Sequence, residues 1–346
     1  MDSITQAVLG ASVQGALLGR WQGRKALLYG AALATLPDLD VVLDYGDAIA
    51  EMTYHRGFSH SLLVLSALAA VLTWLVRRCW PNAGYTTGRL FLTLWLVLIT
   101  HPLLDAFTSY GTQLFWPFPV QPTAWSTIFI IDPLYTVPLL LAVVAGAFAG
   151  LHGRVARWPA VALGVSTAYL AFTVGGKLMA DHRIDQALAA RGIQPDTVFT
   201  TPTPFNSLLW RAVVVDGNDY YEALVSWFDR EPPALVRLDR GGELAAQLER
   251  STQHHRLMWF TGGVLRYDEI DDQLLVTDLR LGMTGFHPFR FPMAERVDGQ
   301  WQLIGYVERL PAERGDLSRL AVLWQRIWHQ QPEVPLAEWT AELKRR

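Results

Sequence analysis

The stretch RLFLTLWLVLITHPLLDAF, residues 89–107, combines the two features that dominate this chain. Between Arg89 and His101 it contains no ionisable side chain, and its aliphatic and aromatic residues form one continuous apolar run. A helix needs about twenty predominantly apolar residues to cross a bilayer. The stretch therefore predicts a membrane helix that carries a histidine and an aspartate close to its end.

Similar apolar segments recur throughout the part of the chain that precedes residue 177. We predict six membrane segments, at residues 3–19, 26–43, 61–76, 90–107, 127–151 and 158–176. The first is short and rich in glycine and alanine, which suits close helix packing better than lipid contact. The alternative is a soluble all-helical core, but helices in such a core seldom run this long without a charge.

Beyond residue 177 the apolar residues alternate with polar ones and charged residues become frequent. Alternating runs around a polar turn, typical of β-hairpin strands, occur at residues 213–226, 265–281 and 294–306. Helical spacing occurs at residues 241–260 and 317–330. We therefore predict an all-α polytopic membrane domain with about six transmembrane helices at residues 1–177, followed by a smaller soluble α+β domain at residues 178–346.

The overall charge and the cysteine content exclude several classes of protein. The formal net charge is −3 and the basic residues form no continuous tract, so we expect no direct contact with nucleic acid. Cys79 is the only cysteine, which excludes an intramolecular disulfide and a cysteine-based metal cluster. The chain starts with an acidic instead of a basic region, so we expect this segment to be retained and not cleaved as a signal peptide.

Basic residues gather in alternate connections between the predicted segments. They are Arg20, Arg24, Lys25, Arg77, Arg78, Arg89, Arg154 and Arg157. By the positive-inside rule, connections rich in lysine and arginine face the cytoplasm. With six crossings, both termini and the soluble domain are then predicted to be extracytoplasmic.

The same alternation predicts that the polar residues of the apolar half gather at the opposite membrane face. They are Asp2, Asp38, Asp40, His55, His60, His101, Asp105 and Asp132. A charged side chain at the centre of a membrane helix costs about 2.5–3.5 kcal/mol, so it usually has a partner or a function. His101 and Asp105 are four residues apart and share one helix face. Imidazole and carboxylate groups are ligands of catalytic zinc, and they also suit manganese and iron.

Several of these residues have a simpler structural interpretation as well. Asp132 precedes Pro133 as a helix N-cap would, and Asp2 can cap the first helix. His101 can be a core histidine that bonds a backbone carbonyl group. Ser59 lies beside His60, but no nucleophile elbow surrounds it, which argues against a serine hydrolase.

The strings MDSITQAVLGA, LPDLDVV, HRGFSHSLL, HPLLDAFTSYGTQLFWPF and IIDPLYT, in this order, resemble the membrane-bound metal-dependent hydrolases. That family is also described as LexA-binding, inner-membrane-associated hydrolases. The resemblance covers roughly residues 1–180, and residues 201–223 are similar to a downstream domain of longer members. It implies a multi-pass inner-membrane protein with candidate metal ligands at Asp38, Asp40, His55, His60, His101 and Asp105. Many members have histidine where this chain has Gln6.

We therefore expect metal-assisted hydrolysis with one or two divalent ions, of which zinc is the first candidate and manganese or iron the alternatives. The catalytic candidates are Asp38 and Asp132, as carboxylates for proton transfer, and Arg56. Arg56 can pair with an anionic group such as a phosphate, or it can be an interfacial arginine with its head in water.

A site that opens at the bilayer surface favours a lipid-like or phosphoester substrate. The expected partners are membrane lipid and, as the resemblance implies, a protein regulator. Two other functions use the same residues. An ion or solute transporter would use the His/Asp cluster as a transport path. A non-catalytic membrane scaffold would bind a regulatory partner through its soluble domain.

Overall fold

The structure is a computed structural model that describes residues 1–81, 84–311 and 316–345. The chain forms two compact units. The first unit consists of Met1–Asp44 and Tyr54–Thr173, and the second of Tyr45–Thr53 and Val174–Arg346. Compared with the predicted division into residues 1–177 and 178–346, the second unit also takes in the short segment Tyr45–Thr53.

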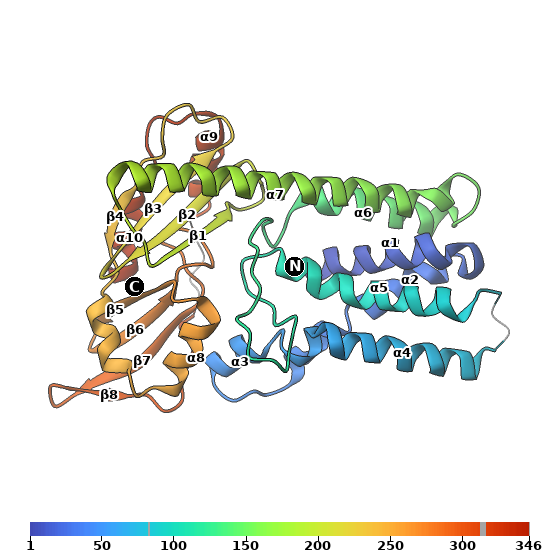
Figure 1. The fold of residues 1–346 in the computed structure, drawn as a ribbon, viewed down its shortest axis with the longest axis horizontal. Coiled ribbons are helices and arrows are strands. Elements are labelled where there is room, and N and C mark those ends of the chain that lie inside the picture. The colour runs from blue at the N-terminus through green and yellow to red at the C-terminus, as the bar shows by residue number, and fades with distance from the viewer. Residues whose placement is uncertain (82–83, 312–315, 346) are drawn as a thin grey trace. The chain divides into compact units, whose positions relative to one another are not determined.

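The first unit is helical (Figure 1). Its α-helices are α1 (Ser3–Gln22), α2 (Lys25–Ala34), α4 (Leu62–Cys79), α5 (Thr87–Ala106), α6 (Pro133–Ala149) and the part of α7 (Trp158–Arg191) up to Thr173. Three short 3-10 helices connect them, namely η1 (Pro37–Val42), η2 (Phe58–His60) and η3 (Val155–Arg157). Helix α1 packs against α2, α5 and α6 and forms the centre of this unit.

Three of the described helices are long and apolar enough to cross a membrane. They are Leu62–Cys79, Thr87–Ala106 and Val155–Arg191. The structure therefore does not support the six predicted spans. Helix α2 has only 10 residues and α6 has 17. Helix α1 has 20 residues, but it buries polar side chains such as Gln6, Ser12 and Gln14 and packs inside the unit.

Helix α2 ends early because of a proline. Its C-cap is Thr35, and Pro37 is the first residue of η1, since a proline ring clashes with the preceding turn in a helix interior. Glycines hold α2 against α1. A Cβ atom added to Gly10 would lie 2.3 Å from the Cβ atom of Ala34, and one added to Gly30 would lie 2.3 Å from the Gly10 carbonyl oxygen. The predicted close packing of the first segment is thus present, and it fixes the end of α2 beside α5.

The two ends of the first unit differ in chemistry. At one end, Trp21 in the last turn of α1 contacts Tyr85 before α5, with ring centroids 6.0 Å apart. The Arg24 guanidinium group donates a 2.6 Å hydrogen bond to the Phe148 carbonyl oxygen at the end of α6. These connections contain most of the basic residues of the unit. At the other end, the Asp2 backbone N–H donates a 3.1 Å hydrogen bond to the carbonyl oxygen of Ile130.

The second unit contains two antiparallel four-stranded sheets, with strand orders β1-β2-β3-β4 and β5-β6-β7-β8. The strands are β1 (Thr197–Pro202), β2 (Leu209–Asp216), β3 (Asp219–Ser226), β4 (Val236–Asp239), β5 (Leu265–Ile270), β6 (Gln273–Asp278), β7 (Arg290–Val297) and β8 (Gln300–Leu303). Its helices are the part of α7 from Val174 onward, α3 (Ala48–Tyr54) up to Thr53, η4 (Gly242–Leu248), α8 (Thr252–Thr261), α9 (Ser318–Trp328), α10 (Leu336–Ala341) and η5 (Glu342–Arg345).

The predicted hairpins are confirmed by the pairs β2–β3, β5–β6 and β7–β8. In the last of these, Asp298 and Gly299 both have positive φ angles, of 51° and 78°, as a tight two-residue hairpin turn requires. The helix expected at residues 241–260 is divided into η4 and α8. Ser251 separates them because its side chain accepts a hydrogen bond from the His254 N–H group and caps α8, which is a typical serine N-cap.

Candidate metal centre

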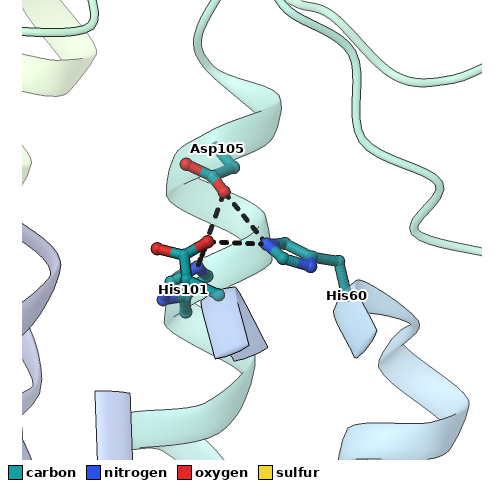
Figure 2. Close-up of side chains that lie close together, drawn as sticks. His60, His101 and Asp105 are labelled. Carbon is teal, nitrogen blue, oxygen red and sulfur yellow. Dashed lines mark hydrogen bonds and ion pairs between the residues drawn. The ribbon is translucent and has the colours of Figure 1, made fainter. Parts of the chain in front are cut away.

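Four side chains from separate parts of the first unit bring ligand atoms to one place. They are Asp38 of η1, His60 of η2, and His101 and Asp105 of α5, and one ligand atom from each lies within 4.8 Å of all the others. Figure 2 shows His60 and Asp105 pointing toward one another, with His101 on the same helix as Asp105. Among the residues that the structure describes, this is the one such group of His, Cys, Asp and Glu side chains.

The distances within this group fit a shared cation better than hydrogen bonds. The His60 Nε2 atom lies 3.5 Å from Asp38 Oδ1 and 3.3 Å from Asp105 Oδ2. The corresponding distances from His101 Nε2 are 3.3 and 3.5 Å. A charge-assisted N–H···O bond is shorter, about 2.7–2.9 Å. Two ligands of a tetrahedral zinc ion, each bound at about 2.0–2.2 Å, lie about 3.4 Å apart.

Hydrogen bonds on the far side of each imidazole ring orient the two histidines. His101 Nδ1 lies 2.6 Å from the Ala34 carbonyl oxygen, which can only accept, so Nδ1 carries the proton. The Ser59 hydroxyl group donates a 2.6 Å bond to Asp40 Oδ2. Its oxygen then accepts from His60 Nδ1 at 2.9 Å. Both Nε2 atoms are thereby directed at the carboxylates of Asp38 and Asp105, as in the outer shell of a metal site.

Asp40 and His55 form a pair of their own next to the four ligand atoms. Asp40 Oδ1 lies 2.9 Å from His55 Nδ1, and Asp40 Oδ2 accepts from the Arg56 N–H group at 3.2 Å. The His55 and His60 rings are in edge contact, with centroids 5.8 Å apart. The His55 side chain is 22% exposed, whereas that of His60 is fully buried. Asp40 therefore orients His55 directly and His60 through Ser59.

The pKa values of Asp38 and Asp40 lie below the ordinary value of an aspartate. Burial alone raises the pKa of Asp38, but its contacts with His101 and His60 lower it by more. Burial likewise raises the pKa of Asp40, and hydrogen bonds with His55 and Ser59 outweigh that effect. Both groups are therefore carboxylates at neutral pH, which is the form that binds a cation.

Arg56 lies beside the four ligand atoms. Its Nε atom is 3.3 Å from Asp105 Oδ2, and its guanidinium carbon lies 4.9 Å from the centre of the Tyr110 ring. The side chain is buried, yet within the described part of the chain its Nε and Nη1 atoms have no hydrogen-bond partner. The backbone of Arg56 has a φ angle of +61°, a left-handed conformation that a non-glycine residue rarely adopts without a structural or functional reason.

Unpartnered buried atoms test whether the group fits a metal ion. Among the described residues, His60 Nε2 and Asp105 Oδ2 are buried and form no hydrogen bond. A buried polar atom without a partner costs about 1–3 kcal/mol, and a cation between these two atoms would satisfy both. The donor set of two imidazoles and two carboxylates suits zinc, manganese or iron. The residues present therefore fit a divalent metal ion.

Four polar residues of the predicted set lie outside the group of four. Asp2 caps α1, because its side chain accepts a hydrogen bond from the Thr5 N–H group. Asp40 and His55 pair as described above, so their role as ligands stays a prediction. Asp132 is the N-cap of α6: its Oδ1 atom accepts from the Leu134 and Tyr135 N–H groups, and its Oδ2 atom accepts from the Tyr169 hydroxyl group at 2.8 Å. Its catalytic role also stays a prediction, and these contacts give it a structural one.

The sequence singled out Gln6 but left its role open, and it did not reveal the supporting role of Ser59. Gln6 is buried, and its Nε2 atom donates to the His101 carbonyl oxygen at 3.2 Å and to Asp105 Oδ1 at 3.1 Å. The Met1 amino group also contacts Asp105 Oδ1. Gln6 therefore orients a ligand carboxylate and is not one of the four ligands. Ser59 was considered only as a nucleophile, although its spacing from His60 is compatible with the supporting role that the structure reveals.

Together, the helical unit with membrane-length helices and its His/carboxylate group define an integral membrane protein with a candidate metal site. Residues 1–180 match the family described as the YdjM inner membrane protein. This match covers more than half of the chain, which therefore belongs to that family and is an inner-membrane protein.

Two curated relatives are similar to parts of the chain. The chain is 38% identical to the Escherichia coli (strain K12) inner membrane protein YbcI over 96 residues, which make up 28% of this chain and 54% of the relative. It is 30% identical over 152 residues to YfhP of Bacillus subtilis (strain 168), called an uncharacterized protein. The matched region makes up 41% of this chain and 45% of the relative. The chain thus spans about half the length of these relatives. No solved structure matches it.

Proposed function

We propose that this protein is a membrane-embedded metal-dependent hydrolase in which Asp38, His60, His101 and Asp105 hold one divalent ion, with zinc as the first candidate. The observation that carries this proposal is the set of four nitrogen–oxygen distances of 3.3–3.5 Å between oriented imidazoles and carboxylates. They are too long for charge-assisted hydrogen bonds and match the separation of ligands around one ion. A second ion, for which Asp40 and His55 are the remaining candidates, is a further expectation.

An ion of this kind lowers the pKa of a bound water from about 16 to about 7 and polarises a substrate oxygen. Access for substrate is expected on the side of Asp38, because its side chain is 24% exposed while the other three ligands are buried. Arg56, buried against Asp105, would attract an anionic substrate group and stabilise negative charge that develops on it.

His55 is the residue that we assign to proton transfer. Its Nδ1 atom is held by the Asp40 carboxylate at 2.9 Å, and a carboxylate in this position fixes the tautomer and the orientation of a catalytic imidazole. The ring is partly exposed and touches the ring of His60. In this proposal His55 donates a proton to the leaving group, and Asp38 stays a ligand.

The substrate that fits these groups is a phosphoester, delivered by the membrane. Arg56 offers a cation for a phosphate group, and guanidinium groups pair with phosphate through parallel hydrogen bonds. Two ligands lie in the last turns of the membrane-length helix α5, and His60 lies just before the membrane-length helix α4. These helix ends are close to where a lipid headgroup would lie. A lipid-like phosphoester is therefore the first candidate substrate.

We further infer that the metal centre and the second unit face away from the cytoplasm. The basic connections, with Arg24 and Arg154 among them, mark the cytoplasmic end by the positive-inside rule. Helix α7 starts beside that end and passes Asp132, which lies near the opposite end and accepts from Tyr169 of α7. The chain would thus leave the membrane on the side of the metal centre. A C-terminal reporter active only in the cytoplasm should be silent, and activity would contradict this orientation.

The hydrolase proposal is tested with purified, metal-loaded protein and vesicles that contain phosphoester lipids. We expect release of phosphate or headgroup by the wild-type protein and loss of release in Asp38→Asn. His55→Gln should lower kcat while the metal content stays unchanged, and Arg56→Lys should raise KM. The matched control is Asp44→Asn, an exposed carboxylate outside the centre. The proposal is wrong if wild-type protein and Asp38→Asn release product at the same rate on every lipid tried.

A further inference from the structure

A large groove lies along α2 in the first unit, apart from the metal centre. It has a volume of about 1110 Å³ and is lined by residues of α1, α2, α4 and α5 and of the connection that follows α4. Figure 1 shows these four helices as neighbours. Small-molecule sites usually have volumes of about 300–1,000 Å³, so the groove is large enough for an extended ligand. We call it the α2 groove.

The walls of the α2 groove change in character along its length. The apolar part is formed by Leu33, Leu36, Leu72, Val76, Leu90 and Leu94. The other part is formed by aromatic and polar side chains, namely Trp21, Gln22, Lys25, Tyr29, Trp80 and Tyr85. Tryptophan, tyrosine and basic residues are typical of the membrane–water interface, whereas leucine and valine are typical of the hydrocarbon interior.

The length of α2 matches the thickness of one leaflet. Its 10 residues, Lys25–Ala34, span about 15 Å at 1.5 Å per residue, and half of a typical bilayer core is also about 15 Å. Lys25 at one end of α2 and Leu36 just beyond its other end both line the groove. The groove thus has the polarity and the depth of a single lipid molecule in the leaflet at the basic end.

A buried polar atom in the wall also lacks a partner. Gln14 is 2% exposed, and its Nε2 atom donates to Gln22 Oε1 at 2.9 Å, while Gln22 Nε2 donates to the Tyr85 hydroxyl oxygen at 3.2 Å. Within the described residues, Gln14 Oε1 accepts no hydrogen bond. A buried acceptor without a donor costs about 1–3 kcal/mol, and a ligand that donates a hydrogen bond to it removes this cost. A ligand with a hydroxyl group would supply that donor.

The charges around the polar part of the groove indicate the sign of the ligand. Lys25 lines it. The guanidinium groups of Arg20 and Arg89 lie 5.6 and 4.8 Å from the ring centre of Trp21, which is another lining residue. No Asp or Glu is among the lining residues that the structure describes. Basic side chains near a membrane surface attract anionic lipids.

We propose that the α2 groove binds one anionic phospholipid, with its headgroup phosphate at Lys25 and one acyl chain along Leu33, Leu72 and Leu36. This site goes beyond the hydrolase function and does not depend on it, because its lining residues include none of the four metal ligands. The bound lipid would fill the space between α2 and α4 and so support α2, which is followed by the 3-10 helix η1 with Asp38.

The test uses the full chain, extracted with detergent from bilayers of phosphatidylglycerol and phosphatidylcholine in equal amounts. Native mass spectrometry then counts the lipids retained per chain. We expect one retained phosphatidylglycerol, preferred about fivefold over phosphatidylcholine, which is the size expected for one lysine near an anionic headgroup. Equal retention of both lipids would contradict the assigned headgroup site.

Matched variants separate the groove from general lipid adhesion. Ala32→Trp fills the groove from an exposed position of α2 and should abolish retention, whereas Ala147→Trp, at an exposed position of α6 outside the groove, should not. Leu72→Trp fills the groove from α4 and replaces Ala32→Trp as the test variant if Ala32→Trp does not fold. Lys25→Gln should lower the preference about fivefold, and the exposed Arg78→Gln should leave it unchanged. Retention that is equal in Ala32→Trp and Ala147→Trp overturns the proposal.

Discussion

Both units bury charged side chains, but they neutralise them in different ways. In the second unit, buried arginines pair with buried carboxylates, as in Arg266–Asp268, Arg280–Asp278 and Arg326–Asp229. In each of these pairs two N–H groups donate to the two carboxylate oxygens, over distances of 2.6–3.1 Å. In the first unit, the Nε2 atoms of His60 and His101 lie 3.3–3.5 Å from the carboxylate oxygens of Asp38 and Asp105.

This difference separates structural charges from a candidate ligand site. A bidentate arginine–carboxylate pair satisfies both partners within the chain, so it needs nothing from outside. The four ligand atoms of the first unit are crowded together and only partly satisfied. Buried polar groups left in this state are expensive. A bound cation is the group that would satisfy all four ligand atoms. The arrangement of these atoms therefore predicts a binding function, whereas the arrangement of the arginine–carboxylate pairs predicts a contribution to stability.

The largest expected effect is the loss of the ion when a ligand is removed. His101→Ala and Asp105→Asn should each reduce the metal content from about one ion per chain to a small fraction of that, since loss of a mere outer-shell partner already weakens binding about 10–100-fold. The measurement is elemental mass spectrometry of protein purified without chelators. Asp132→Asn removes a buried carboxylate that caps α6 and should keep its metal. Full occupancy in both ligand variants would show that the pair is only structural.

A loss of stability without a loss of metal is expected when a buried arginine–carboxylate pair of the second unit is broken. Asp229→Asn should destabilise the fold by about 3–5 kcal/mol, because it leaves the buried Arg326 charge without a partner. The metal content should not change. Urea unfolding in detergent micelles measures the free energy, and the double variant Arg326→Met/Asp229→Leu should recover much of the loss. A stability cost below about 1 kcal/mol, as for a surface pair, would contradict the comparison.

A smaller effect is expected at the residue that orients His60. Ser59→Ala removes the hydroxyl group that links His60 Nδ1 to Asp40 and should weaken metal binding about 10–100-fold. Competition with a chelator measures the affinity. Ser61→Ala is the matched control because Ser61 caps α4 and bonds the Trp116 carbonyl oxygen, so it should cost stability without changing the affinity. Equal affinities in Ser59→Ala and the wild-type protein would exclude this role.

The smallest effect is a pH dependence that belongs to the second unit alone. Burial, followed by the nearby His255 charge, lowers the pKa of His254 to about 4. The folded state thus binds this proton less tightly than the unfolded state, whose pKa is about 6.5. The stabilising contribution is complete above pH 6.5 and is lost as the pH falls from there toward 4. The free energy of unfolding, measured at several pH values between 4 and 7, should vary less with pH in His254→Gln than in the wild-type protein. The control His329→Gln alters an exposed histidine and should keep the wild-type pH dependence.

The prediction of the metal centre from sequence was strongest where the ligands are close in the chain. The spacing of His101 and Asp105 places both on one face of a helix, and α5 carries them in that way. The string PDLDVV could not separate Asp38, which joins the group, from Asp40, which supports it. The two carboxylates are two residues apart in a 3-10 turn, and small differences in their direction decide which one reaches the histidines.

The number of spans was predicted less well because hydropathy does not show where a helix stops or what covers it. Residues 26–43 are apolar almost throughout, yet α2 ends at Ala34. Helix α1 has the length of a span, but much of its surface is covered by protein. Periodicity was more reliable in the second unit, where the three hairpins have the predicted positions, because the side chains of a strand alternate between its two faces.

The amino-acid sequence by itself determined the apolar helices, the hairpins, the basic connections and the types of ligand available, because these depend on composition and on spacing within single segments. Only the tertiary structure decided which carboxylates meet which imidazoles, and that the first unit contains a groove along α2. Both depend on the approach of α2 to α1 at Gly10 and Gly30 and on its position beside α5. Such contacts between distant segments are set by packing, since a shift of about 1 Å between helices would separate ligands that a metal ion must bind at about 2 Å.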